Sequence, residues 1–229
     1  MAAPLPIPSP LPPGSVPSIG PFELSGGVLC LDFVNTWGDR ARPESDQLPR
    51  FDDLLGFGAQ TGGLDEVQRQ QLAEWSAGDS AAATAALAAA RTLRESLYGI
   101  FAARARGREI PPPDLARLNA TLREALAHLR VEAQPGGFSA DNALVSDAAR
   151  FAWAFEASPA PTAPLWPIAR SAAELLVSSD LARVTQCDGA RCTWLFLDHS
   201  RTHTRRWCSM ESCGNRAKAQ RHYRRRREA

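Results

Sequence analysis

The sequence predicts an α+β protein in two parts, a larger helix-dominated domain followed by a small domain built around a metal site. Apolar side chains recur at helical spacing through much of the first part. Four of the five cysteines crowd into the last 43 residues, at Cys187, Cys192, Cys208 and Cys213. In a reducing compartment such clustering favours metal binding over disulfides. With 229 residues and 44% apolar content, the chain is long enough to bury a core.

The charge distribution supports the same division. The whole chain carries a net charge of only +1. From Arg183 to Ala229, however, 12 Lys and Arg face 4 Asp and Glu, a net charge of +8, whereas the preceding residues carry −7. The sequence therefore predicts an acidic body over residues 22–182 and a basic module over residues 183–229.

The N-terminal segment, residues 1–21, carries 8 of the 18 prolines. Because proline fixes φ and lacks an amide donor, we expect an extended, disordered leader, and a plain flexible tail is favoured over a docking motif. No run of 18 apolar residues and no basic stretch followed by an apolar one occurs, so neither membrane insertion nor secretion is indicated. A cytoplasmic location is expected.

Order is expected to begin near Phe22. The apolar run from Val28 to Val34 is interrupted only by Asp32 and suits either a buried strand or a short helix. Asp32 is interpreted as a hydrogen-bonded structural carboxylate and Cys30 as a small core residue. Short helices are expected over Phe51–Leu64 and around Trp75.

Two further helices follow from clear apolar stripes. One stripe contains Leu93, Leu97, Ile100 and Phe101, and the other contains Leu115, Leu118, Leu122, Leu126 and Leu129. The prolines at 111–113 separate them, with Asp114 expected as an N-cap. Large and small side chains alternate over Phe151–Phe155, which predicts a strand. Pro167 is expected at the first position of a last body helix that ends at Ser179–Asp180.

The cysteines occur as two pairs, each with four residues between its members, and 15 residues separate the pairs. Four thiolates complete the tetrahedral shell of one structural zinc ion and leave no open position for catalysis. Two disulfides or redox thiols are the alternatives. A hairpin is expected from Trp194–Leu197 and a returning strand at Arg205–Trp207, followed by a helix over Asn215–Arg227. This order defines a treble-clef zinc finger.

The module is rich in arginine, which suits bidentate contacts to phosphates and to guanine edges. Nucleic acid, DNA before RNA, is therefore the expected partner, and an RNA-binding or ribosome-associated finger or a solvated basic tail are the alternatives. The candidate contact residues are Arg201, Arg205, Arg206, Asn215, Arg216, Lys218, Arg221, Tyr223, Arg224 and Arg225.

Several motifs resemble known families. Cys213-Gly214-Asn215-Arg216 resembles the tetrapeptide that names the CGNR zinc fingers, and Leu31 to Thr36 resembles the opening motif of the ABATE domain that accompanies them. The resemblance implies a bacterial regulator of transcription linked to stress, with a ligand-sensing N-terminal domain and a C-terminal treble-clef finger that binds DNA.

A ligand site in the body is predicted from polar residues after the first apolar run. Asn35, Thr36, Asp39 and Arg40 are the candidates from position, and Arg94 and Asn119 join them by resemblance, all for an unknown small molecule. Asn35 and Thr36 could equally cap or turn the backbone. The chain has no glycine-rich phosphate loop, nucleophile elbow or catalytic metal motif, so no enzyme is predicted.

Overall fold

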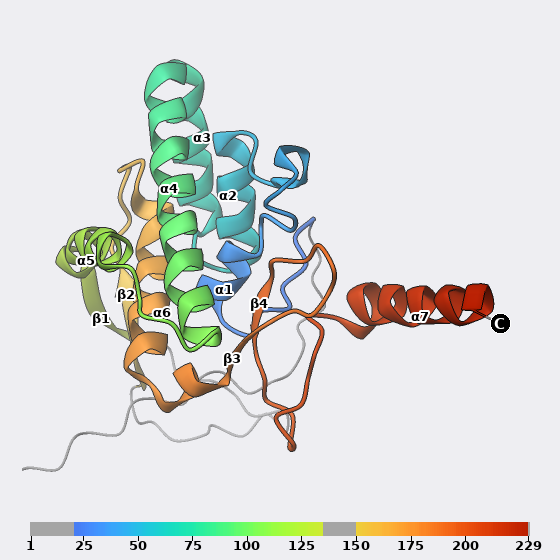
Figure 1. Ribbon diagram of the computed structural model, residues 1–229. Coiled ribbons are helices and arrows are strands. Elements are labelled where there is room, and N and C mark those ends of the chain that lie inside the picture. The colour runs from blue at the N-terminus through green and yellow to red at the C-terminus, as the bar shows by residue number, and fades with distance from the viewer. Residues whose placement is uncertain (1–20, 135–149, 229) are drawn as a thin grey trace, which may run out of the picture.

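The computed structural model describes residues 21–134 and 150–228 (Figure 1). Helices dominate, two small sheets complete the structure, and the expected α+β class is confirmed. Except for Pro21, the expected proline-rich leader lies outside the described residues. No helix in the described ranges is long and apolar enough to cross a membrane.

The N-terminal domain is built around one long helix. This is α4, Ser80–Ala105, which packs against α1, α2, α3 and α5 (Figure 1). Helix α6 packs in turn against α1 and α5. The other helices of the domain are α1 (Leu29–Val34), α2 (Phe51–Gln60), α3 (Glu66–Gly78), α5 (Pro112–Ala127) and α6 (Trp166–Val177). Short 3₁₀ turns η1, η2 and η3 span Pro43–Ser45, Ala163–Leu165 and Ser179–Arg183.

The apolar run from Val28 to Val34, for which the sequence allowed a strand or a short helix, forms helix α1. Cys30, Leu31, Phe33 and Val34 are all buried against α4 and α6, as the expected core position of Cys30 requires. Asp32 accepts a hydrogen bond from the Gly26 amide at 2.7 Å. Burial raises the pKa of its carboxyl to about 7, although this hydrogen bond opposes the rise.

Two antiparallel hairpins make up the sheets. Strand β1, Leu129–Gln134, pairs with β2, Arg150–Phe155, and confirms the predicted strand. Leu129 therefore lies in β1 rather than on the stripe of α5, which ends at Ala127. The second sheet pairs β3, Val184–Gln186, with β4, Leu195–Leu197.

Two predicted helix ends need correction. Asp114 is not the N-cap of α5, because the helix begins at Pro112 and Pro111 precedes it. Its carboxylate lies instead over Gly99 of α4, where a Cβ would come within 2.2 Å of Oδ2. Helix α2 ends at Gln60 and not at Leu64, because Gly62 adopts a positive φ of 71°.

The returning strand predicted at Arg205–Trp207 does not form. β4 pairs with β3, which precedes the first cysteine pair. Asp198 organises the loop between β4 and Cys208, since its carboxylate accepts hydrogen bonds from the amides of Ser200 and Arg205 at 2.9 and 3.0 Å. The first cysteine pair thus lies in the turn of the hairpin rather than before it.

The second sheet shares the core of the N-terminal domain. Leu195 and Leu197 of β4, with Val184 of β3, belong to the same buried cluster as α1 and α4. The Leu197 amide donates to the carbonyl of Gly26 at 2.9 Å. The sheet after residue 183 thus contributes to the core of the N-terminal domain, whereas Trp194 and Phe196 pack with the cysteines in a second buried cluster.

Candidate metal centre and basic helix

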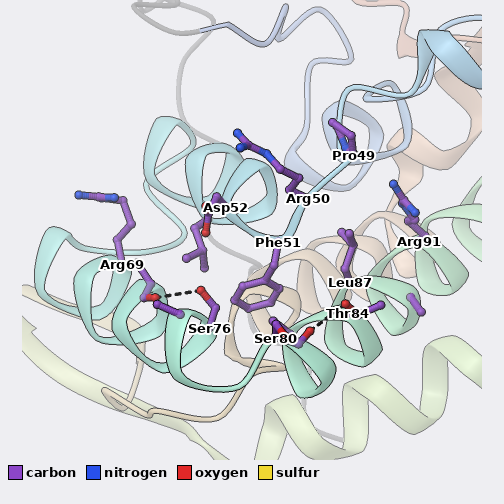
Figure 2. A pocket seen from close by; sticks show the side chains of 15 residues that line it. Pro49, Arg50, Phe51, Asp52, Arg69, Ser76, Ser80, Thr84, Leu87 and Arg91 are labelled. Carbon is purple, nitrogen blue, oxygen red and sulfur yellow. Dashed lines mark hydrogen bonds between the residues drawn. The ribbon is translucent and has the colours of Figure 1, made fainter.

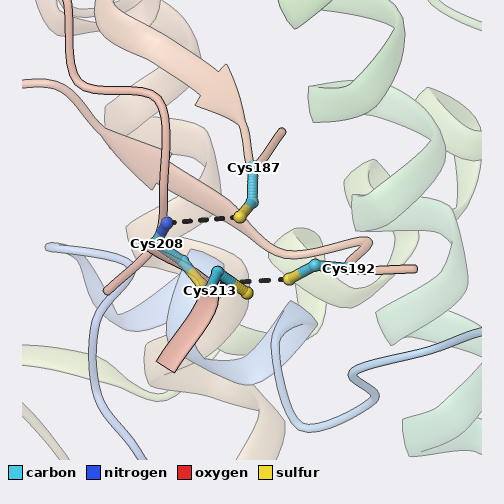
Figure 3. A group of neighbouring side chains, drawn as sticks. All are labelled: Cys187, Cys192, Cys208 and Cys213. Atoms are coloured by element: carbon cyan, nitrogen blue, oxygen red, sulfur yellow. Dashed lines mark hydrogen bonds between the residues drawn. The ribbon is translucent and has the colours of Figure 1, made fainter. Parts of the chain in front are cut away.

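The four predicted cysteine ligands come together in one place (Figure 3). Cys187 directly follows β3, and Cys192 lies in the turn before β4. Cys208 ends the long loop, and Cys213 belongs to a π-helical turn η4, Met210–Gly214. Their sulfur atoms all lie within 4.8 Å of one another.

The geometry fits a tetrahedral metal site. A zinc–sulfur distance of about 2.3 Å places two sulfurs about 3.8 Å apart. The sulfurs of Cys192 and Cys208 are 3.8 Å apart. Three of the four cysteines are buried, so the donor set is both closed and shielded from solvent. The arrangement is that of a structural metal site.

Neighbouring donors favour the thiolate form of Cys187. The amides of Cys208 and Gly189 donate to Cys187 Sγ at 3.3 and 3.4 Å. Hydrogen bonds from the thiols of Cys192 and Cys208, and secondarily from these amides, lower the pKa of Cys187 although burial opposes the change. Gly189 favours the close approach of the ligands, because a Cβ at this position would lie only 3.0 Å from Cys213 Sγ.

The last helix, α7, Asn215–Glu228, begins where η4 ends, two residues after the last cysteine. The positive end of its dipole therefore faces the thiolates. Arg216 adds a hydrogen bond from its guanidinium to Cys213 Sγ at 3.6 Å. The helix predicted to bind nucleic acid is thus in direct contact with the fourth ligand, Cys213.

Helix α7 extends away from the rest of the molecule (Figure 1) and packs chiefly against η4. It carries seven Lys and Arg residues and one acidic residue. The described basic side chains of the helix are exposed. Among the described residues, Lys218, Arg221 and Arg225 form no ion pair. Most of the charge of α7 is therefore not neutralised by the body.

The three arginines predicted on the hairpin differ in their surroundings. Arg201 is exposed in the loop. Arg206 is also exposed but pairs with Asp188 at 2.7 Å. Arg205 donates to the carbonyls of Trp207 and Cys208, and its guanidinium lies 4.2 Å above the Phe196 ring. Its geometry assigns Arg205 to holding the loop that carries Cys208.

Four of the residues expected to bind a ligand, Asn35, Thr36, Arg40 and Arg94, form an internal network instead. The Asn35 amide group accepts from the Leu195 amide and donates to the Leu195 carbonyl, both at 2.8 Å. Arg40 bonds Glu95 at 2.9 Å and the Thr193 hydroxyl at 2.7 Å, and its guanidinium lies 3.7 Å above the Tyr98 ring. These contacts fasten β4 and the residues before it to α1 and α4.

The same network contains a buried ion pair. Arg94 is fully buried and makes two 2.7 Å hydrogen bonds to the Asp46 carboxylate, and a third at 3.0 Å to the Thr36 hydroxyl. Burial raises the pKa of Asp46, but the bonds from Arg94 and the Leu48 amide outweigh it and hold the pKa below its usual value. The polar side-chain atoms of these four residues are therefore engaged within the chain, apart from Arg94 Nε, which has no hydrogen-bond partner among the described residues.

Replacing Arg94 by Met should destabilise the protein by about 3 to 5 kcal/mol, because it leaves a mostly buried carboxylate without its main partner. Arg91, 3.5 Å from Asp46, should keep the loss near the lower value. Denaturant unfolding measures it, with exposed Arg123→Ala as the control, expected within about 0.5 kcal/mol of wild type. A loss below about 1 kcal/mol for Arg94→Met would contradict this role.

A groove in the N-terminal domain lies among α2, α3 and α4 (Figure 2). It has a volume of about 650 Å³, and Phe51 points into it with Arg50, Arg69 and Arg91 around it. Arg69 pairs with Glu66 at 2.5 Å, and Arg91 donates to the Leu48 carbonyl at 2.7 Å. Its cationic rim is thus largely engaged by the protein itself.

Sequence reasoning missed several residues that shape the site. Asp46, Glu95 and Thr193 hold the network together, and Gly189 allows the close approach of the thiolates. The three network residues act across 48 to 153 positions of sequence. Only Gly189, inside the first cysteine pair, carried a local signal.

The fold is therefore that of a two-part protein, in which a helical domain is joined to a four-cysteine candidate metal site that leads into a basic helix. Comparison with known families agrees with this division. Residues 27–179 match the ABATE family, whose description is "Putative stress-induced transcription regulator". Residues 183–226 match the CGNR zinc finger. The chain belongs to the ABATE family and carries a CGNR zinc finger. No curated protein matches the chain.

Proposed function

We propose that the protein is a DNA-binding regulator of transcription in which one structural zinc ion, held by Cys187, Cys192, Cys208 and Cys213, fixes α7 for contact with duplex DNA. The four-thiolate donor set supports zinc, because thiolates in a tetrahedron are its preferred structural ligands. The same closed set leaves no open coordination position, so the proposal assigns no catalytic reaction to the metal.

Helix α7 carries this proposal. Its basic side chains are exposed over its whole length. Its first turn is bonded to the ligand Cys213 through Arg216, so a bound metal would hold the start of the helix in place. The major groove of B-DNA is wide enough to admit an α-helix, and arginine there contacts guanine edges as well as phosphates. Arg201 and Arg206 add to the positive field, whereas Arg205 is left out because its guanidinium is bonded to the backbone.

Shortening α7 provides the test. Each phosphate neutralised on duplex DNA adds about −0.9 to the slope of log affinity against log salt, so about five contacts give a slope near −4 to −5. A chain ending at Tyr223 loses four consecutive arginines and should show a slope flatter by roughly 2 to 4. All four cysteines precede the cut, so metal content should not change. Titrations at several salt concentrations measure the slope.

The control removes three exposed arginines outside the module, in the variant Arg106→Ala, Arg108→Ala and Arg123→Ala, and should leave the slope unchanged. An unchanged slope in the shortened chain would mean that the arginine run is a solvated tail, and the proposal would fail. Competition between duplex DNA and structured RNA at matched salt separates DNA binding from the alternative of an RNA-binding finger.

We further propose that the N-terminal domain senses a small molecule and passes the signal to the metal module. The hydrogen bonds from Asn35 to the Leu195 backbone, and from Arg40 to Thr193, join the two parts rigidly. A change in the conformation of the N-terminal domain near α1 would therefore act directly on Thr193 and β4, which lie next to the cysteine site.

A further inference from the structure

A cavity of about 540 Å³ lies where the N-terminal domain, the first cysteine pair and the start of α7 meet. The loop after α1 contributes Asp39 and Arg42, the turn between β3 and β4 contributes Arg191, and α7 contributes Arg216 and Gln220. The volume falls within the range of about 300 to 1,000 Å³ that is usual for small-molecule sites. Arg216 and Gln220, four positions apart, lie on the same face of α7.

Most charges that line this cavity are already compensated. Asp188 pairs with Arg206 at 2.7 Å, and Arg42 lies 3.6 Å from Glu44. Burial raises the pKa of Glu23, and the nearby positive charge of Arg216 opposes the rise, so these two groups also balance each other in part.

Two opposite charges remain. Arg191 forms no hydrogen bond or ion pair through its side chain with any described residue. The Asp39 carboxylate accepts only a local hydrogen bond from the Ala41 amide, at 3.2 Å, and pairs with no described cation. Although both line the same cavity, they do not meet each other. One guanidinium and one carboxylate are therefore available to a ligand.

Trp194 forms part of the same wall and is 8% exposed. Its indole Nε1–H finds no acceptor among the described residues. Gly38, the neighbour of Asp39, lies next to it, since a Cβ on Gly38 would be 3.4 Å from Nε1. Any shift of the loop that carries Asp39 would therefore change the surroundings of this indole group.

We propose that this cavity binds a small zwitterion, a molecule of the amino-acid type, with its carboxylate at Arg191 and its ammonium group at Asp39. A purely anionic ligand is disfavoured, because the Asp39 carboxylate would repel it and would itself stay without a partner. The bound molecule touches α7 at Arg216 and Gln220, so it ties the placement of α7 to the N-terminal domain. This last step alone rests on the proposed function.

The test uses the full-length, metal-loaded chain with ¹⁵N-labelled tryptophan. Each of the twenty common L-amino acids is titrated separately, and the Trp194 indole signal, assigned by its loss in Trp194→Phe, is followed by NMR. At least one amino acid should shift this signal in a saturable way. Its N-acetyl and its carboxamide derivatives, which each lack one charge, should bind at least about 10-fold more weakly.

Two variants locate the charges. Arg191→Ala and Asp39→Asn should each weaken binding by about 10- to 100-fold, the range for a lost charge-assisted hydrogen bond. Asp39→Asn keeps an oxygen for the Ala41 amide, and the exposed Arg191 side chain forms no hydrogen bond or ion pair with the described residues, so both variants should fold. The control Arg108→Ala should bind as wild type. Unfolding midpoints equal to that of wild type verify folding.

The proposal is wrong if none of the twenty amino acids shifts the Trp194 signal, or if both variants bind as tightly as wild type. Equal binding of the N-acetyl derivative would also overturn it, since a carboxylate alone would then suffice. DNA affinity is measured separately without amino acid. A chain that binds DNA but no amino acid contradicts only this inference, and the reverse result contradicts only the proposed function.

Discussion

Replacing Cys213 by Ser is expected to abolish metal binding and to lower the stability of the whole chain, not of the C-terminal module alone. Structural zinc contributes roughly 10 to 16 kcal/mol of apparent binding free energy in small fingers, and most of it is folding free energy. Here β4 joins the metal module to the central core through Leu195 and Leu197. Loss of the metal should therefore loosen the contacts of β4 with α1.

Metal analysis and thermal unfolding measure both parts of this expectation. Wild type should carry about one zinc per chain, and Cys213→Ser should carry almost none and unfold at a lower temperature. Cys30→Ala is the matched control, because Cys30 is buried in the core away from the four ligands. Full zinc retention in Cys213→Ser, or an unchanged midpoint after complete chelation, would refute the assignment.

Much of the fold is predictable because its signals are local. The stripe through Leu93, Leu97 and Ile100 repeats at helical spacing, and it forms part of α4 as expected. The four cysteines are likewise found from composition and spacing alone. Periodicity and ligand chemistry need no knowledge of distant residues, so they survive in a single sequence.

The remaining features depend on contacts between distant segments. β4 could pair with a strand on either side, and the sequence does not reveal that Val184–Gln186 is its partner. Asn35 and Arg94 have the residue types of a binding pocket, yet their partners Leu195 and Asp46 lie 160 and 48 positions away. A cluster of polar residues in the sequence thus predicts that their side chains need hydrogen-bond partners. It does not predict whether a ligand or a distant part of the chain provides these partners.

A fragment from Phe22 to Asp180, which the charge boundary defines as a domain, is expected to lose its cooperative unfolding transition. The cut removes Val184, Leu195 and Leu197 from the common core. Each contributes about 1.5 to 3 kcal/mol on burial, and the Asn35 amide group loses both backbone partners at about 1 to 3 kcal/mol. This total is comparable to the whole stability of a typical domain, about 5 to 15 kcal/mol.

A longer fragment from Phe22 to Asp198 is the matched comparison, because it restores β3 and β4 but still lacks Cys208 and Cys213. If the shared core is the cause, circular dichroism during denaturant unfolding should show a cooperative transition in the longer fragment and a broad one in the shorter. A sharp transition of the shorter fragment at the midpoint of the full chain would instead mean that the N-terminal domain folds without β4. In that case the hydrogen bonds of Asn35 would join two independently stable units, and the metal would stabilise only its own module.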